Sequence, residues 1–174
     1  MATDSTAPSM NQFTIAMIWF VLIFAAMALI FNILLDDINN PNQQLEVSFN
    51  QNGDREIVLE RNKHGHYVAT GQINGQPVEF FLDTGATVVA IPEHIADTLK
   101  LKKGQSFITQ TANGNSKSYE TTLDTVSLGD IVISNVPASI SSGMEFDEIL
   151  LGMSFLKHLD MVQQGKTLTL KVPE

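Results

Sequence analysis

The stretch FFLDTGATVVA, residues 80–90, decides the fold of this chain. It consists of two apolar runs joined by a tight turn that carries Asp83 and Gly85. A carboxylate beside such apolar residues is costly to bury unless it is hydrogen-bonded or paired. Gly85 leaves room for another backbone or a second carboxylate to approach closely. The stretch therefore predicts a strand–turn–strand unit that presents Asp83 for chemistry, with an ordinary β-turn as the alternative.

The sequence around this unit is rich in short β-like runs separated by turn signals. Asn74-Gly75 and Asn113-Gly114 are strong hairpin signals, because both residue types tolerate the positive φ that such turns require. Only two stretches are expected to be helical, 93–100 and 152–159. Many short strands with hairpin turns and one or two short helices predict a small, closed, mostly β barrel over residues 54–174.

An apolar stretch near the N-terminus predicts one transmembrane helix. Residues 13–35 contain no charged side chain, and a helix rising about 1.5 Å per residue over this length spans the hydrocarbon core of a bilayer. A signal peptide is the alternative, because Ala26-Met27-Ala28 mimics a small-x-small cleavage site. The apolar run continues to Leu35 and no basic residue precedes it, which favours an uncleaved anchor.

Charge limits the partners and the location of the chain. All 10 Lys and Arg lie from Arg55 onward, and the residues from there on contain 14 of the 19 acids. An acidic domain without a basic stripe lacks the footprint of a nucleic-acid binder. Neither flank of the apolar stretch offers the Lys or Arg that would fix its orientation, and Asp36 and Asp37 favour an outward-facing C-terminal side. We therefore expect a single-pass inner-membrane protein with a periplasmic domain.

The segment between the apolar stretch and the β-rich region is polar and rich in Asn and Gln, and Pro41 should break a helix that continues from the membrane. It therefore predicts a linker. Four parts are expected in all: a tail over 1–12, a transmembrane helix over 13–35, a linker over 36–53 and the β domain over 54–174.

Three landmarks resemble those of the clan AA aspartic proteases. FFLDTGAT is similar to their active-site motif, in which two apolar residues precede Asp-Thr-Gly. The alanine that follows this motif, Ala86, resembles the residue found there in the single-domain retropepsin branch. Leu150, Leu151 and Gly152 match the apolar pair and glycine that brace the active-site strand. A hairpin lies between them, where the family has a flap over the substrate. The resemblance covers roughly residues 56–172 and extends to a bacterial branch with an N-terminal membrane anchor.

The resemblance implies an aspartic endopeptidase in which Asp83 activates water. The chain has one Asp-Thr-Gly, since Asp124-Thr125-Val126 lacks the glycine. A second carboxylate must then come from another copy across a two-fold axis, and the two carboxylates would share one proton. The last strand, 167–172, is expected to pair across that axis. The implied supporting residues are Thr84, Gly85 and Ala86 in the active-site loop and Thr111, Ala112, Asn113 and Gly114 in the flap.

No metal or cofactor is expected, and a peptide or protein is the expected substrate. The chain has no Cys, so His64 and His66, which would share a strand face, are the nearest approach to a zinc pair. The alternative to an enzyme is a non-catalytic module of the same fold that binds peptides or partners as a homodimeric adaptor. A tethered scaffold without a peptide groove is the third possibility. The intact active-site motif favours the enzyme.

Overall fold

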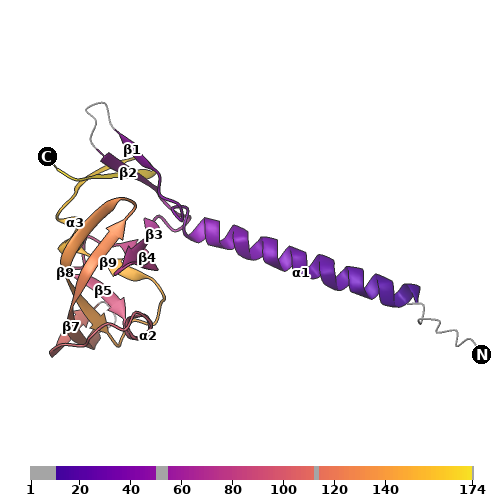
Figure 1. Cartoon of the computed structure of the whole chain (residues 1–174), viewed down its shortest axis with the longest axis horizontal. Coiled ribbons are helices and arrows are strands. Elements are labelled where there is room, and N and C mark those ends of the chain that lie inside the picture. The colour runs from indigo at the N-terminus through magenta and orange to yellow at the C-terminus, as the bar shows by residue number, and fades with distance from the viewer. Residues whose placement is uncertain (1–10, 50–54, 112–113, 174) are drawn as a thin grey trace, which may run out of the picture. The chain divides into compact units, whose positions relative to one another are not determined.

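The computed structural model describes residues 11–49, 55–111 and 114–173. The chain divides into two compact units, Met1–Asp36 and Asp37–Glu174 (Figure 1). The first unit consists of most of helix α1, which runs over Gln12–Asn39 and stops just before Pro41. Its portion Gln12–Phe31 has a mean hydropathy of 2.6 and no buried residue, so α1 is apolar and long enough to be a membrane span or a signal sequence.

The second unit is mostly β with two short helices in its described part, as predicted. Its elements are, in chain order, β1 (Val47–Phe49), β2 (Arg55–Glu60), β3 (Val68–Ile73), β4 (Gln76–Leu82), β5 (Val89–Pro92), α2 (Glu93–Thr98), β6 (Ser106–Thr111), β7 (Gly114–Leu128), β8 (Ile131–Ser141), β9 (Ile149–Leu151), α3 (Met153–Leu156), β10 (Asp160–Gln164) and β11 (Thr167–Lys171).

The larger sheet has the hydrogen-bonded order β3-β4-β9-β5-β8-β7-β6, and β3 also pairs with β7. The first six of these strands therefore form a closed ring. The sequence predicted a closed, mostly β domain, and this ring closes it. The inward-facing side chains of its central strands are fully buried: Phe80, Val89, Ile91, Ile149 and Leu151. Because a slip of one residue would turn these side chains outward, burial fixes the register of the ring.

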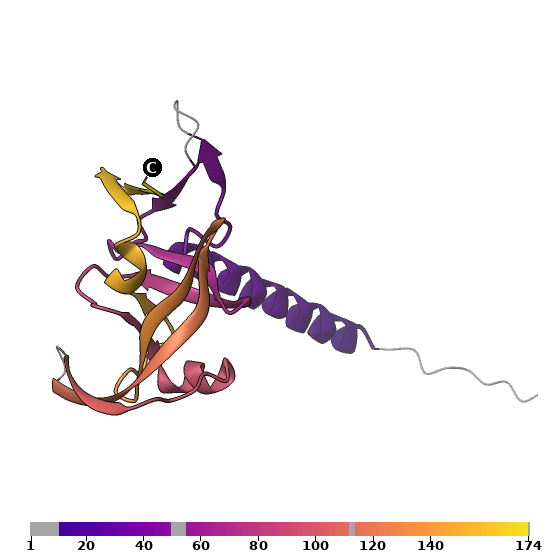
Figure 2. The same ribbon diagram turned by 60° about the vertical axis from the view of Figure 1, so that its left-hand side comes forward.

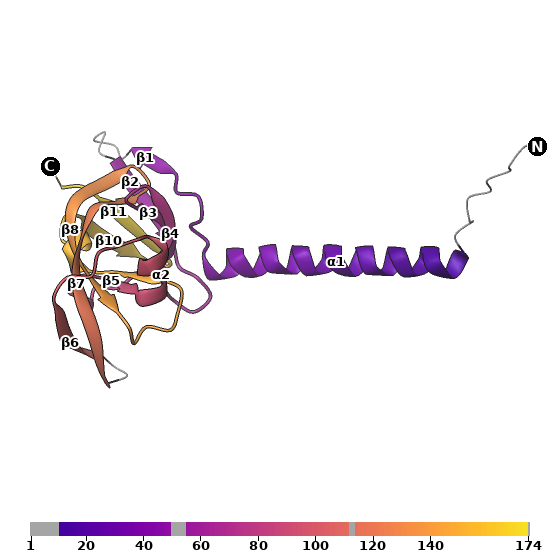
Figure 3. The same ribbon diagram turned by 60° about the horizontal axis from the view of Figure 1, so that its bottom comes forward.

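Two hairpins were expected from Asn-Gly pairs. Asn74 and Gly75 have φ values of 50° and 77° and join β3 to β4, which confirms the first. In the second, β6 pairs with β7 up to Thr111 and Gly114, while Ala112 and Asn113 lie outside the described residues. Figures 2 and 3 show that this hairpin extends from the end of the domain opposite the smaller sheet.

The smaller sheet has the order β1-β2-β11-β10. Strand β11 lies between β2 and β10 and pairs antiparallel with both, so both of its edges are used within one chain. The expectation that 167–172 pairs across a two-fold axis is therefore wrong. The cause is β10, whose sequence DMVQQ has no clear alternation and did not indicate a strand. A tight turn at Gly165, with φ 59°, folds β11 back onto it.

Part of the segment expected to be a free linker is built into the domain. The buried side chain of Asn42 accepts a hydrogen bond from the N–H of Glu60 at 2.7 Å and donates to the carbonyls of Glu60 and Val68 at 2.9 and 2.7 Å. Its own carbonyl accepts from the N–H of Thr70 at 3.1 Å. Asn42 thus supplies the hydrogen-bonding groups of a strand between β2 and β3.

Candidate active site

Asp83 directly follows β4 and begins a tight turn. The N–H of Gly85 donates to its Oδ1 at 2.8 Å, and the N–H of Ala86 donates to its carbonyl at 3.2 Å. A Cβ on Gly85 would lie 3.1 Å from the same Oδ1. Asp83 is half-buried, whereas Thr84 and Gly85 are exposed. The turn therefore orients one carboxylate oxygen by a backbone donor and leaves the loop open on one side.

Strand β9 holds this loop in place. It lies between β4 and β5, parallel to the first and antiparallel to the second, with Leu150 opposite both Phe81 and Ala90. The N–H of Asp83 donates to the carbonyl of Leu151 at 3.2 Å, and the N–H of Met153 donates to the carbonyl of Ala86 at 2.8 Å. Hydrogen bonds from one later segment thus fix the loop both at Asp83 and at Ala86.

Gly152 is placed where no side chain fits. A Cβ there would collide with the carbonyl of Val88 and lie 2.7 Å from the carbonyl of Ala86. Two residues later, the buried Oγ of Ser154 accepts a hydrogen bond from the N–H of Val89 at 3.0 Å. The structure thus brings the predicted bracing residues to the Asp83 loop. It also adds Ser154, which lies in the predicted helix 152–159 and had not been singled out there.

An apolar row lies beside Asp83 on the sheet face that points away from the core. Phe81, Leu150 and Ala90 are aligned by register, and each is partly exposed, whereas the residues on both sides of Leu150 and of Ala90 are buried. Phe81 is two residues before Asp83, so the two side chains leave the strand on the same face. The ring of His66 packs 4.8 Å from that of Phe81 and extends the row at one end.

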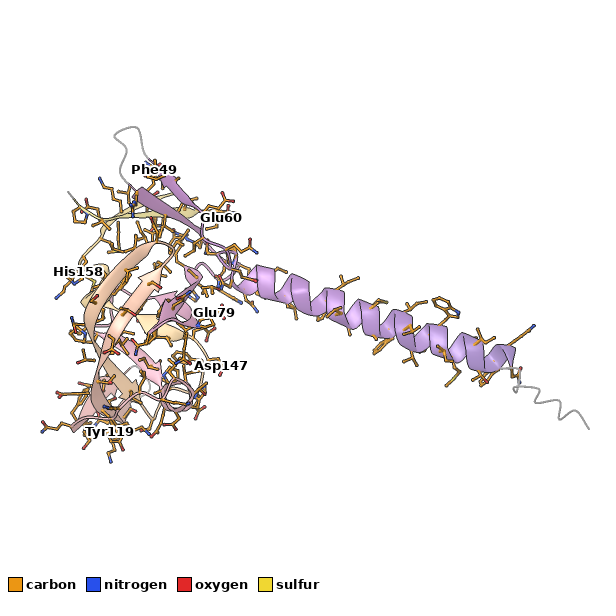
Figure 4. All side chains as sticks on the ribbon, in the orientation of Figure 1. Phe49, Glu60, Glu79, Tyr119, Asp147 and His158 are labelled. Carbon is orange, nitrogen blue, oxygen red and sulfur yellow. The ribbon has the colours of Figure 1, made fainter. Side chains whose placement is uncertain are left out.

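The expected flap is a hairpin with apolar side chains on its surface. Ile108 and Phe107 on β6 are 66% and 39% exposed. The Thr109 hydroxyl donates to Ser118 Oγ at 2.8 Å and joins the two arms. Farther along β7, the ring of Tyr119 has the Lys117 ammonium 5.0 Å from its centroid (Figure 4). The structure therefore gives this tyrosine a cation–π contact within the hairpin.

The remaining polar clusters lie elsewhere. A groove of about 520 Å³ is lined by residues of the 99–104 loop and of β7, among them the exposed Asp124, and Asp83 is absent from its lining. Lys103 beside it bonds Glu93 and Asp97 at 2.8 and 3.3 Å. The hydrogen bond to Glu93 raises the pKa of the Lys103 ammonium above its usual value. Over the described ranges, no three His, Cys, Asp or Glu side chains gather into a metal cluster.

The site lies within a segment that matches a known family. Residues 69–158, just over half of the chain, match the family model described as "gag-polyprotein putative aspartyl protease". The chain belongs to this aspartyl protease family. Its fold is retropepsin-like: a retropepsin-like aspartic protease from Rickettsia conorii is 26% identical, with a TM-score of 0.56 over 74% of this chain and 94% of that one.

Two curated relatives have no described activity. An uncharacterized protein encoded in the cobV 5′ region of Sinorhizobium sp is 33% identical over 114 residues, which are 64% of this chain and 49% of the relative. An uncharacterized protein of Rickettsia prowazekii (strain Madrid E) is 32% identical over 107 residues, 59% of this chain and 45% of the relative. The chain thus spans about half the length of the curated relatives that it matches.

We predict that Gly152→Ala destabilises the domain, because the added methyl group must push β9 away from the Asp83 loop. Overpacking of this kind costs about 1–3 kcal/mol. Urea unfolding followed by circular dichroism measures the change. Gly75→Asn is the matched control, since that glycine lies in an open turn at φ 77°, which Asn tolerates. Equal stability of the two variants would mean that Gly152 does not brace the loop.

Proposed function

We propose that this chain is an aspartic endopeptidase and that Asp83 is its catalytic carboxylate. The observation that carries the proposal is the loop itself. In a chain of this family, Asp83 is oriented by the Gly85 N–H, held by β9 and left open to solvent on one side. An adaptor that only binds partners has no use for a half-buried carboxylate held in this way.

The reaction requires two such carboxylates. Two aspartates at close range share one proton, because they cannot both ionise comfortably. The ionised member takes a proton from a bound water, which attacks the scissile carbonyl. The protonated member donates a hydrogen bond to the developing oxyanion, and the leaving amine is protonated as the peptide bond breaks. No covalent intermediate forms.

The second carboxylate is supplied by a second copy of the chain in this proposal. The sequence contains one Asp-Thr-Gly, so each chain contributes half of the site. Thr84 is exposed, and within the described residues its hydroxyl makes no hydrogen bond. A two-fold axis between two Asp83 loops would cover both hydroxyls and allow them to bond across the axis.

We expect the substrate to carry apolar side chains beside the scissile bond. The row of Phe81, Leu150 and Ala90 offers apolar contact next to Asp83. The exposed Ile108 of the hairpin offers a second apolar contact if this hairpin closes over bound peptide. We therefore assign the hairpin as the flap, with its tip at 111–114.

We propose that α1 anchors the enzyme in the inner membrane and that the protease domain lies in the periplasm. Helix α1 continues well past Ala28, where a signal peptidase would cut. The adjoining Asn42 is already part of the folded domain. A membrane anchor also confines two copies to one surface and so raises their effective concentration.

The decisive test is Asp83→Asn, which removes the group that acts as base. We expect loss of at least about 10³-fold in peptide cleavage with unchanged unfolding, because no other group can replace the carboxylate. The control is Asp124→Asn, which changes an exposed aspartate in the superficially similar Asp124-Thr125-Val126 and should keep full activity. Turnover by a clean Asp83→Asn preparation would refute the aspartic mechanism.

The flap assignment predicts that Ile108→Ser weakens substrate use without destabilising the domain. Burying an isoleucine side chain contributes about 1.5–3 kcal/mol, so kcat/KM should fall about tenfold or more. Val132→Ser is matched to it, because that residue is 57% exposed on β8 and lies outside the hairpin. Gly114→Pro is a poor probe, since φ 107° at that position excludes proline. If both serine variants cleave alike, the hairpin does not cover the substrate.

The anchor predicts that the mature protein keeps its N-terminal residues and stays in the membrane pellet after alkaline carbonate extraction. Mass spectrometry distinguishes this from a signal peptide, whose removal after Ala28 would release a chain shortened by 28 residues. Ala28→Leu supplies the control, because it blocks small-x-small cleavage. An anchored protein behaves the same with either residue, whereas a processed one would be retained only as the variant.

A further inference from the structure

The turn 62–66, which precedes β3, is closed by one asparagine. The Oδ1 of Asn62 accepts hydrogen bonds from the N–H groups of His64 and His66, both at 3.0 Å. The N–H of Asn62 donates to the carbonyl of His66 at 2.8 Å, and the N–H of Gly65 donates to the carbonyl of Asn62 at 3.0 Å. These hydrogen bonds order the backbone that carries the two histidines before any ligand binds, so a ligand that contacts their side chains does not have to order the turn.

His66 lies on the sheet face that carries Asp83. Val68 on β3 is paired with Phe81 on β4, and His66 is two residues before Val68, so its side chain leaves the chain on the same face as Phe81. The same register, continued by two residues, sets His66 opposite Asp83. The imidazole packs against the ring of Phe81, with centroids 4.8 Å apart. His66 is therefore the polar end of the apolar row beside the candidate catalytic carboxylate.

The turn offers cationic groups to solvent at this end of the row. Lys63, His64 and His66 are exposed, and the two imidazole rings are stacked with centroids 6.5 Å apart. Among the residues that the structure describes, no acid forms an ion pair with Lys63 or His66. The acids on the same face are Asp83 and Glu79, and Glu79 is partly buried and has an interaction of its own. A carboxylate on a bound peptide would thus find unpaired donors at the turn.

We propose that His66 is a specificity-determining residue, which binds an Asp or Glu side chain of the peptide substrate. This inference rests on the proposed function, since it adds a subsite to the same active site. A neutral imidazole donates one hydrogen bond to a carboxylate, and a protonated imidazole adds its charge to that bond. The nearby ammonium of Lys63 contributes a second positive charge to the subsite. Binding of an uncharged polar side chain gains neither of these charge terms.

The geometry limits the position of the acidic residue in the substrate. Phe81 and Asp83 are two residues apart, which is about 7 Å along a strand, and the imidazole is one ring contact beyond Phe81. An extended peptide advances about 3.3 Å per residue, so the acidic residue should lie within about three positions of the scissile bond. In the proposed homodimer a two-fold axis repeats the turn on the other side of that bond, and the same preference then holds on both sides.

Paired synthetic peptides test this subsite on the full-length protein in detergent micelles. The peptides have Leu and Phe at the scissile bond and carry Glu or Gln at one position within three residues of it, and mass spectrometry identifies the cleaved bond. At about pH 5.5, where an ordinary imidazole is mostly charged, kcat/KM for the Glu peptide should exceed that for the Gln peptide by about fivefold at one position or more. Equal values within every pair would overturn the proposal.

Three replacements of His66 separate recognition of the carboxylate from packing on Phe81. His66→Gln should abolish the preference for Glu, His66→Lys should keep it, and His66→Glu should replace it with a preference for Lys in the peptide. The changes should appear mainly in KM, because the contact is the same in the bound substrate and in the transition state. His158→Gln is the matched control, since it removes an exposed imidazole after α3 (Figure 4) and should keep the full preference. Retention of the preference in His66→Gln, or the same loss in all three variants, would count against the subsite.

Peptide binding separates this inference from the catalytic proposal. Fluorescence anisotropy with Asp83→Asn measures the binding of the same labelled peptides without turnover. If the wild-type protein cleaves none of the peptides, the catalytic proposal fails, while tighter binding of the Glu peptide that is lost in the double variant with His66→Gln still supports the subsite. If the wild-type protein cleaves the peptides and Asp83→Asn does not, but neither cleavage nor binding distinguishes Glu from Gln, the catalytic proposal stands and His66 does not bind the substrate carboxylate.

Discussion

The hydrogen bond from the Asp83 N–H to the carbonyl of Leu151 is the contact on which the rest of the domain depends. It joins a loop to a strand that the chain supplies more than sixty residues later, so β9 must enter between β4 and β5 before the loop is complete. The intervening residues form the hairpin and β8, which carry the chain back to that position. The core and the candidate site are therefore formed by the same step, and neither is complete without the other.

The sequence predicted the structure best where a residue pattern is compatible with few backbone conformations. Asn74-Gly75 had to turn, and the apolar residues around Asp83 had to form paired, buried strands. It was least informative for β10, whose mixed residues gain their strand conformation only by pairing with β11. The contact between Ser154 and Val89 was also beyond prediction, since it joins residues 65 positions apart. The same limit explains why the last strand was assigned a partner in another chain, although β2 and β10 already occupy its edges.

In the proposed homodimer each chain holds half of the site, and catalysis would then be a property of the assembly. Free energy that would otherwise stabilise the monomer is then released on association, and activity follows the concentration of copies. The exposed Thr84 in a single chain is consistent with this arrangement, because a polar loop that awaits a partner can remain hydrated. Confinement to a bilayer would favour association without any change in the interface itself.

Proteolytic release of the domain from α1 would weaken its structure, because Asn42 contributes hydrogen bonds to it. A cut between Asn42 and β2 would separate the domain from α1 covalently, and the asparagine would then stay bound only through its contacts with Glu60, Val68 and Thr70. Its departure would leave these buried and partly buried backbone groups without that partner and open the seam between β2 and β3. The freed domain would therefore be less stable, and the edge of the sheet that includes β2 would loosen first.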